Sequence, residues 1–334
     1  MDGQDAESQC RSELCGLGRM QLDEHHPYRG IAVKKKKRVP NRTATRKPMD
    51  PTASPAPRAS KNQAGYRPMR LTSDPNMILT LLQRGEPDQL LTLLPPLILL
   101  DHVANSGAPG NVCLHAAHEL RVVYTALGVP VEIKPVRLEV RDLERRGGTA
   151  YGVEEPHFTD ADDFVGHCVL RLPSLDRLVD ATVGQFPDVA RRDGSPLVGR
   201  TAFALQGTDP GAAPWPKGSQ IRARRQNLEL RYKVLDPAYD KVVFSGPAAS
   251  AQFQRAIFHN GLNTLAQMVA TLSQYEDAAR RARNASAPTL PALLDAVAGA
   301  EWTPSPEQPD HFIRDGADIR LRDLVDVPRT GIAL

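Results

Sequence analysis

The stretch that decides the fold spans residues 110–129 and reads GNVCLHAAHELRVVYTALGV. Its apolar residues recur at steps of three and four, which predicts an amphipathic helix over residues 112–127. Turn-forming residues precede it, and Gly128 supplies the left-handed conformation that often ends a helix. Cys113 therefore lies in the first turn of this helix, on its apolar face.

Strand patterns follow the predicted helix. Apolar residues alternate from Val129 to Ile133, and the phase slips near Pro135 before alternation resumes to Val140, as a bulge or bend would cause. Two further strands, residues 166–172 and 177–182, are predicted on either side of a turn at 173–176. The remaining strand candidates are residues 201–205 and 228–235.

Helical patterns flank these strands. Leucines at helical spacing predict short helices at residues 76–84, 87–94 and 98–103, and apolar stripes predict helices over 257–275 and 290–297. The order of helices, strands and helices predicts an α+β fold in which the cysteine-bearing helix packs on an antiparallel sheet. We therefore expect three parts: a disordered leader (1–75), an α+β domain (76–245) and a helical C-terminal region (246–334).

The leader is basic. Residues 1–75 hold 15 Lys and Arg against 8 Asp and Glu, whereas the whole chain has a net charge of +3. The composition, rich in Pro, Ala, Ser and Thr, predicts disorder because it offers little apolar surface to bury. Residues 34–38 are four lysines and an arginine, and their functional interpretation is a weak contact with nucleic acid. The composition favours the other interpretation, which is a solvated tail or a leader translated from a start site upstream of the true one.

Cysteine count and hydropathy indicate the compartment. Four cysteines in 334 residues do not make a disulfide framework, which favours a reducing cytoplasm. The first 30 residues lack the apolar segment of a signal peptide. The longest apolar stretch, residues 90–100, is interrupted by two prolines and is too short to cross a bilayer. We expect a soluble cytoplasmic protein without membrane contact.

Cys113, His167 and Asp180 form the candidate site. A thiol, an imidazole and a carboxylate in this order are the parts of an acyl-transfer site. A helix N-terminus and a nearby imidazolium both lower the pKa of a thiol. A two-residue turn places His167 directly opposite Asp180, and a four-residue loop makes them diagonal neighbours on the same face. A three-residue loop would separate them.

These motifs resemble a known family. The segments concerned are residues 110–117, Gly166-His167-Cys168-Val169 and Leu178-Val179-Asp180-Ala181-Thr182. Together they resemble the transglutaminase-like branch of the papain-like thiol enzymes, over about residues 105–185. The resemblance implies that Cys113 is the nucleophile, that His167 is the general base and acid, and that Asp180 orients the histidine. No side-chain oxyanion donor upstream of the cysteine is identified.

The sequence therefore favours a thiol enzyme that acts on an amide, ester or thioester acyl group of a peptide or small substrate. Water as acceptor would make it a hydrolase and an amine a transferase, and the residues do not choose between them. We expect no metal, because Cys113 and His115 lie about 200° apart around a helix. We expect no cofactor, because the sequence has neither a phosphate-binding nor a dinucleotide-binding glycine motif. The alternative is a catalytically inactive binding or scaffolding protein on the same fold, with the basic tail contacting nucleic acid.

Overall fold

The computed structural model describes residues 75–105, 112–145, 147–189, 203–206, 215, 217–225 and 227–325. These residues belong to one compact unit, Pro68–Leu334. The expected boundary near residue 245 therefore does not separate two compact units. The disorder and nucleic-acid contact predicted for residues 1–75 concern a segment that, apart from Pro75, lies outside the described residues.

The α+β fold is confirmed. The described α-helices are α2 (Pro75–Arg84), α3 (Pro87–Asn105), α4 (Cys113–Ala126), α7 (Ala251–Ser273), α8 (Glu276–Ala282) and α9 (Leu290–Ala296). The main sheet contains β1 (Glu132–Asp142), β2 (Gly148–Tyr151), β5 (His167–Leu172), β6 (Arg177–Asp180), β7 (Phe203–Gln206), β8 (Gln220–Arg225) and β9 (Leu228–Val234). Its strand order is β7-β6-β5-β1-β9-β8, with β2 paired to β1, and the pairs are antiparallel. A two-stranded sheet of β3 (His157–Phe158) and β4 (Phe164–Val165) lies apart from it.

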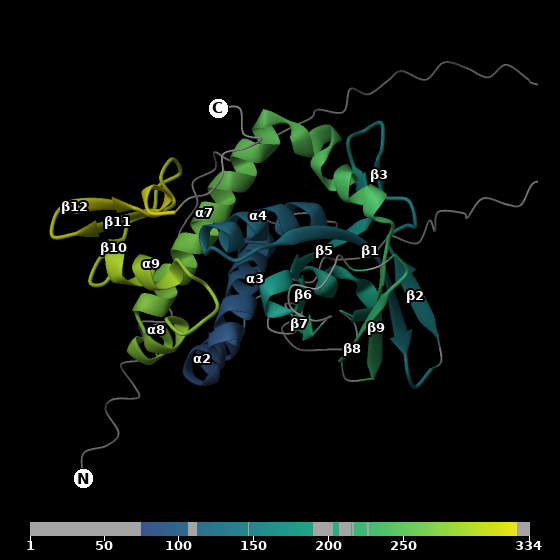
Figure 1. Cartoon of the computed structure of the whole chain (residues 1–334), viewed down its shortest axis with the longest axis horizontal. Helices are drawn as coiled ribbons and strands as arrows, with labels where there is room; N and C mark the ends of the chain where they lie inside the picture. Colours follow the sequence, from purple (N-terminus) through teal and green to yellow (C-terminus); the bar gives the residue numbers. More distant parts are fainter. Residues whose placement is uncertain are drawn as a thin grey trace, which may run out of the picture. The chain divides into compact units, whose positions relative to one another are not determined.

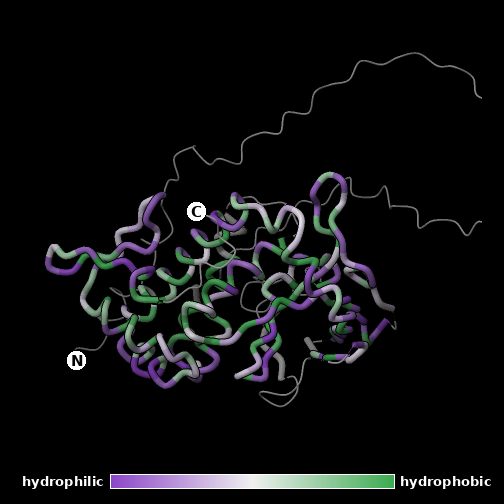
Figure 2. The backbone as a smooth tube through the Cα atoms, turned by 45° about the horizontal axis from the view of Figure 1, so that its top comes forward, coloured by the Kyte–Doolittle hydropathy of each residue, from purple (hydrophilic) through white to green (hydrophobic). Residues whose placement is uncertain are grey.

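Helix α4 packs between the sheet and the other helices. One side contacts β5, and α3 and α7 contact the rest of it (Figure 1). Buried residues of α3, α4, α7 and β5 contribute to one hydrophobic cluster that includes Cys113, Leu120 and Leu170. Hydrophobic stretches run through these packed segments, and hydrophilic residues predominate at outer turns (Figure 2). The cysteine-bearing helix is therefore part of the core, as the sequence predicts.

The predicted phase slip in β1 is present. Its burial alternates from Glu132 to Pro135, is continuous at Pro135 and Val136, and alternates again to Val140. Ile133 belongs to the cluster beneath α4, whereas Val136 and Val140 belong to a second cluster. The slip therefore moves the apolar side of one strand from the first cluster to the second.

The prediction of two separate helices over 87–103 is wrong. Helix α3 continues through Pro95 and Pro96. Pro96 has no N–H to donate to the carbonyl of Thr92 four residues earlier. The hydroxyl of Tyr124 donates to that carbonyl instead, at 3.2 Å. A side chain of α4 thus satisfies a backbone acceptor that proline leaves open.

The C-terminal region predicted to be helical, residues 246–334, contains α7, α8 and α9, together with a small sheet that the prediction did not include. After α9 the chain forms a three-stranded sheet of β10 (Glu301–Trp302), β11 (His311–Arg314) and β12 (Ala317–Arg320). Asp315 and Gly316 join β11 to β12 with φ angles of 53° and 78°. Two consecutive positive φ angles are typical of the tight hairpin turn that Asp-Gly favours. This dipeptide was the signal for the hairpin.

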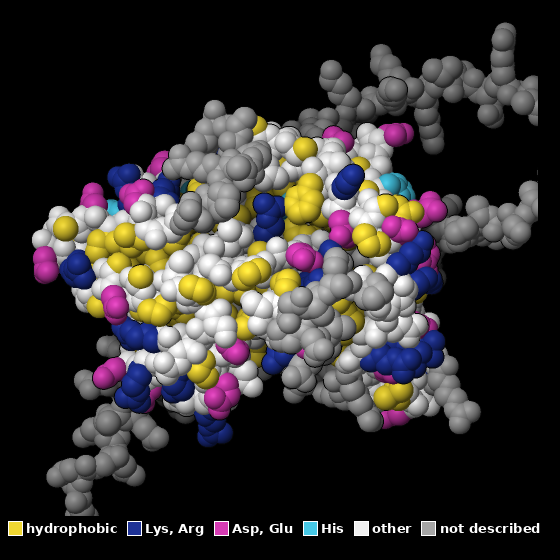
Figure 3. All heavy atoms as spheres, in the orientation of Figure 1, with side chains coloured by type: hydrophobic (Ala, Val, Ile, Leu, Met, Phe, Trp, Pro, Cys, Tyr) yellow, Lys and Arg dark blue, Asp and Glu magenta, His cyan; other side chains and the backbone are white. Residues whose placement is uncertain are grey.

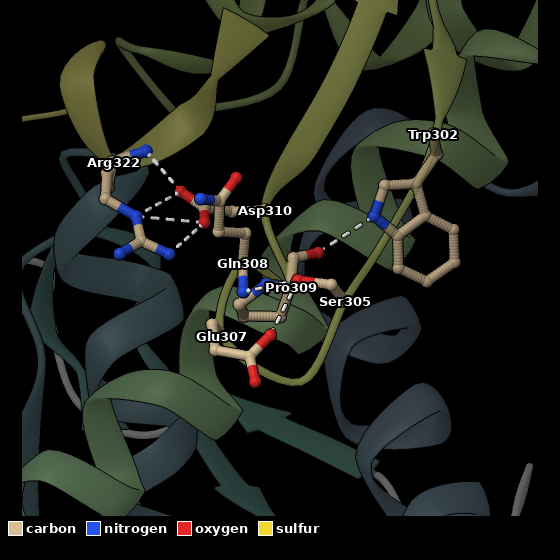
Figure 4. Close-up of polar contacts among 7 residues, drawn as sticks. All are labelled: Trp302, Ser305, Glu307, Gln308, Pro309, Asp310 and Arg322. Atoms are coloured by element: carbon tan, nitrogen blue, oxygen red, sulfur yellow. Dashed lines mark hydrogen bonds and ion pairs between the residues drawn. The ribbon is translucent and has the colours of Figure 1, made fainter. Parts of the chain in front are cut away.

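An ion pair between a buried carboxylate and the partly exposed Arg322 closes the loop between β10 and β11 (Figure 4). Asp310 is 0% exposed. Its carboxylate accepts from Arg322 Nε at 2.9 Å, from the Arg322 backbone N–H at 2.8 Å and from Nη2. Trp302 Nε1 donates to the carbonyl of Pro309 at 2.9 Å. These contacts tie the loop to η6 (Leu321–Asp323).

The surface carries charges of both signs. On the face shown in Figure 3, Lys and Arg side chains are interspersed with Asp and Glu, with hydrophobic side chains between them. Among the described residues, none of the helices has both the length and the hydropathy that a membrane span requires.

Candidate active site

A hairpin positions His167 and Asp180. Strands β5 and β6 pair in the register Leu170 with Val179 and Leu172 with Arg177, so four residues connect them. Three of the four form η2 (Pro173–Leu175), and the fourth, Asp176, is left-handed with φ 49°. His167 and Asp180 are therefore diagonal neighbours on one face, which is the four-residue arrangement considered above. His167 Nε2 lies 2.8 Å from Asp180 Oδ2, and each residue is 1% exposed.

Asp180 receives further hydrogen bonds. The hydroxyl of Tyr232 donates to Oδ2 at 3.0 Å. Thr182 donates to Oδ1 from its backbone N–H at 3.0 Å and from its hydroxyl at 3.3 Å. All of these groups donate to the carboxylate, so its position and its hydrogen bond to the imidazole are fixed.

The His167 ring is held on several sides but has one open nitrogen. Burial alone would lower the pKa of His167, but the charge and hydrogen bond of Asp180, together with the nearby Cys113, raise it to about 10. Phe186 packs edge-on with its centroid 5.0 Å from the imidazole. Gly152 leaves room behind the residue, because a Cβ there would lie 3.2 Å from His167 Cβ. Nδ1 is buried and has no hydrogen-bond partner.

Cys113 begins α4, and its sulfur lies at the start of β5. Sγ is 3.9 Å from the carbonyl oxygen of Gly166, to which it can donate only in the protonated thiol form. A hydrogen bond from the Cys168 side chain, opposed by burial and aided by the nearby His167 imidazolium, holds the pKa of Cys113 well below its usual value. At neutral pH the arrangement favours a thiolate beside an imidazolium. The three residues identified from the sequence thus lie in one buried cluster.

Sequence reasoning missed two other residues at this site. Tyr232 lies on a predicted strand, but nothing in the pattern marks its hydroxyl as a partner of Asp180. Gln185 lies on η3 (Val183–Gln185), and its Oε1 accepts from the Val112 backbone N–H at 3.3 Å. Val112 is the N-cap of α4, which has no capping hydrogen bond of its own. Gln185 therefore holds the segment that positions Cys113.

The two other histidines of α4 do not join the site. His118 is 2% exposed, and its Nε2 lies 2.7 Å from the carbonyl oxygen of Val243 in η4 (Pro237–Phe244). Burial lowers its pKa to about 4. His115 packs against Phe253 with the ring centroids 4.9 Å apart and the ring planes tilted by 56°. Within the described ranges, no group of three or more His, Cys, Asp and Glu is arranged to hold a metal ion.

The site is closed in this structure. Cys113 is 2% exposed. It lines a cavity of about 10 Å³ between α4 and strands β5 and β6, which is room for about one water molecule. An acyl substrate can reach Sγ only if the surrounding residues rearrange.

Comparison of the chain with family models, curated proteins and solved structures finds no match. The resemblance to transglutaminase-like enzymes therefore stays a prediction. Any functional assignment has to be carried by the contacts of Cys113, His167 and Asp180.

Proposed function

We propose that this protein is a thiol-dependent acyl-transfer enzyme of transglutaminase-like type. One observation carries the proposal: Asp180 holds His167 through Nε2, and Nδ1 lacks a partner in the same buried cluster as Cys113. A histidine bound on one nitrogen and open on the other is what a cysteine nucleophile requires of its general base. Cys113 is the nucleophile, His167 the general base and acid, and Asp180 the orienting carboxylate.

The reaction begins when the Cys113 thiolate attacks the acyl carbonyl carbon. The carbonyl π electrons move to oxygen, and first-turn N–H groups of α4 that lack intrahelical acceptors are the proposed donors to that oxyanion. As the intermediate collapses, the bond to the leaving group breaks and His167 protonates that group. Water or an amine then attacks the thioester, His167 takes its proton, and the sulfur leaves as thiolate.

The acceptor decides whether the enzyme is a hydrolase or an acyltransferase. A peptide or a small acyl compound is the proposed substrate, and a reducing cytoplasm is the proposed location because the nucleophile has to stay reduced. The closed cavity favours the alternative of a catalytically silent binding protein on the same fold, with the basic leader in contact with nucleic acid. The experiment below distinguishes the two.

The pH dependence of Cys113 alkylation by iodoacetamide tests the proposal. Cys10 and Cys15 are first replaced by serine, and peptide mapping separates labelling of Cys113 from labelling of Cys168. An activated thiol should react almost as fast at pH 6 as at pH 8. In His167→Gln the imidazolium is lost while the Cys168 hydrogen bond remains, so the pKa of Cys113 should rise and alkylation at pH 6 should be about 10-fold slower than in the parent, or slower still.

His115→Gln is the matched control, since it changes a histidine on the same helix that contacts Phe253 instead. It should keep the parental profile. Thiolate ultraviolet absorbance, followed against pH, gives the same pKa without requiring entry of a reagent. An ordinary thiol pKa in the parent, unchanged by His167→Gln or by Asp180→Asn, would overturn the enzyme proposal and favour the binding protein.

A further inference from the structure

A second cysteine lies against the proposed nucleophile. Cys168 follows His167 on β5, and neither Cys113 nor Cys168 is in a disulfide. Adjacent residues of a strand point to opposite faces. Cys168 shares the α4 side of β5 with Leu170 and Leu172, whereas Val169 belongs to the other hydrophobic cluster.

The two cysteines line the same small cavity. Its lining consists of Cys113, Ala116, Ala117, Leu120, Cys168, Val169, Leu170, Val179, Ala181 and Thr182. Apart from the two sulfurs, the side chains around it are almost all aliphatic. A thiol pair enclosed in this way is held close together and shielded from other thiols of the cell.

The two sulfurs differ in protonation. The Cys168 side chain and its backbone N–H both donate to the Cys113 sulfur. Burial, followed by the hydrogen bond and charge of Cys113, raises the pKa of the Cys168 thiol well above its usual value. One member of the pair is therefore a thiolate and the other a thiol, which is the combination in which one sulfur is oxidised and the other resolves it.

We propose that Cys113 and Cys168 form an oxidation site at which a hydroperoxide converts the two thiols into an intramolecular disulfide that blocks the nucleophile. The Cys113 thiolate attacks one peroxide oxygen and the O–O bond breaks. This gives a sulfenic acid and an alkoxide or hydroxide, which takes a proton from His167. Cys168 then attacks the sulfenyl sulfur, the S–O bond breaks, and the departing hydroxide leaves as water with the Cys168 proton.

The electrons balance in this sequence. The two sulfurs together lose two electrons, and the peroxide gains them. Small hydroperoxides are the oxidants that a cavity of this size admits with the least rearrangement. The step does not require acyl transfer, so the oxidation site goes beyond the proposed function.

The test uses the reduced full-length chain with Cys10→Ser and Cys15→Ser, treated with hydrogen peroxide. Peptide mapping without reductant should show a peptide pair joined through Cys113 and Cys168, and dithiothreitol should restore alkylation of Cys113. In Cys168→Ala the joined peptides should be lost, and Cys113 should proceed to sulfinic acid, which dithiothreitol does not reduce. Cys168→Ser serves as a second variant, and circular dichroism checks that both fold.

Two results would overturn the oxidation site. One is irreversible oxidation of Cys113 at the same rate with and without Cys168. The other is a disulfide that joins two chains instead of one. The alkylation profile tests acyl transfer separately, so failure of either proposal can be recognised without the other.

Discussion

Two buried carboxylates, Asp180 and Asp310, are paired with bases in different ways. Asp310 receives Nε, Nη2 and the backbone N–H of Arg322. Asp180 receives Nε2 of His167, the Tyr232 hydroxyl and Thr182. Both carboxylates are almost fully buried and well supplied with donors. The difference lies in the base.

Arginine keeps its proton in a protein, whereas histidine exchanges one readily. The Arg322 pair therefore only holds a loop in place. In the other pair, Asp180 holds the Nε2 atom of His167. The second ring nitrogen, Nδ1, has no hydrogen-bond partner and belongs to the same buried site as the Cys113 thiol. Burial alone does not distinguish these two pairs, but the imidazole nitrogen of His167 that lacks a hydrogen-bond partner does.

A third buried acid extends the comparison. Glu119 is 7% exposed, and its Oε1 accepts from the neutral amide of Asn260 at 2.9 Å. Burial, only partly offset by that bond, raises its pKa to about 7. Asp310, in contrast, has its pKa lowered, because the hydrogen bonds and charge of Arg322 outweigh burial. The charge of the hydrogen-bond partner therefore decides whether a buried carboxyl group has its pKa raised or lowered.

The largest effect is expected from Arg322→Ala. It leaves the Asp310 carboxylate buried without its cation, which costs about 3–5 kcal/mol of unfolding free energy. Urea denaturation measures this loss, and Arg320→Ala, at an exposed position on β12, is the control. The pH profile of Cys113 alkylation should stay unchanged at temperatures where the variant is folded. A shifted pH profile would contradict the claim that the Arg322–Asp310 pair has no part in the reactivity of Cys113.

Glu119→Gln should change how stability depends on pH. Because the folded pKa of Glu119 lies above its unfolded value, the parent loses stability as pH rises from about 4.5 through 7. Glutamine does not ionise, so the variant does not lose stability in this way. Its unfolding free energy relative to that of the parent should therefore rise by up to about 3 kcal/mol between pH 5 and pH 8. Urea denaturation at both pH values measures the gain. Parallel pH dependence in both proteins would show that Glu119 ionises freely.

Tyr232→Phe should have the smallest effect. It removes one hydroxyl from a buried carboxylate, and a hydrogen bond to a charged group contributes about 1.5–3 kcal/mol. His167 and Thr182 still hold Asp180, so the rate of Cys113 alkylation at pH 6 should fall less than about threefold. Tyr239→Phe, a half-buried tyrosine on η4, is the control. A collapse of reactivity as large as that of His167→Gln would mean that the tyrosine, not the histidine, sets the thiol pKa.

Local patterns determined a large part of this fold. The 3.6-residue period placed α4 and Cys113 at its start, and alternation placed β1 with its phase slip. Residue parity across the hairpin put His167 and Asp180 on one face for the four-residue loop that is present. These features depend on side chains a few residues apart, so the order of residues specifies them directly.

Only the tertiary structure decided which residues far apart in the sequence contact one another. Tyr124 satisfies the carbonyl that Pro96 leaves open in α3, and Gln185 reaches the N–H before Cys113 across 73 positions of the chain. Cys168 became a partner of the nucleophile only because α4 packs on its side of β5. Such contacts arise from how buried surfaces fit together, and neither periodicity nor spacing encodes that fit.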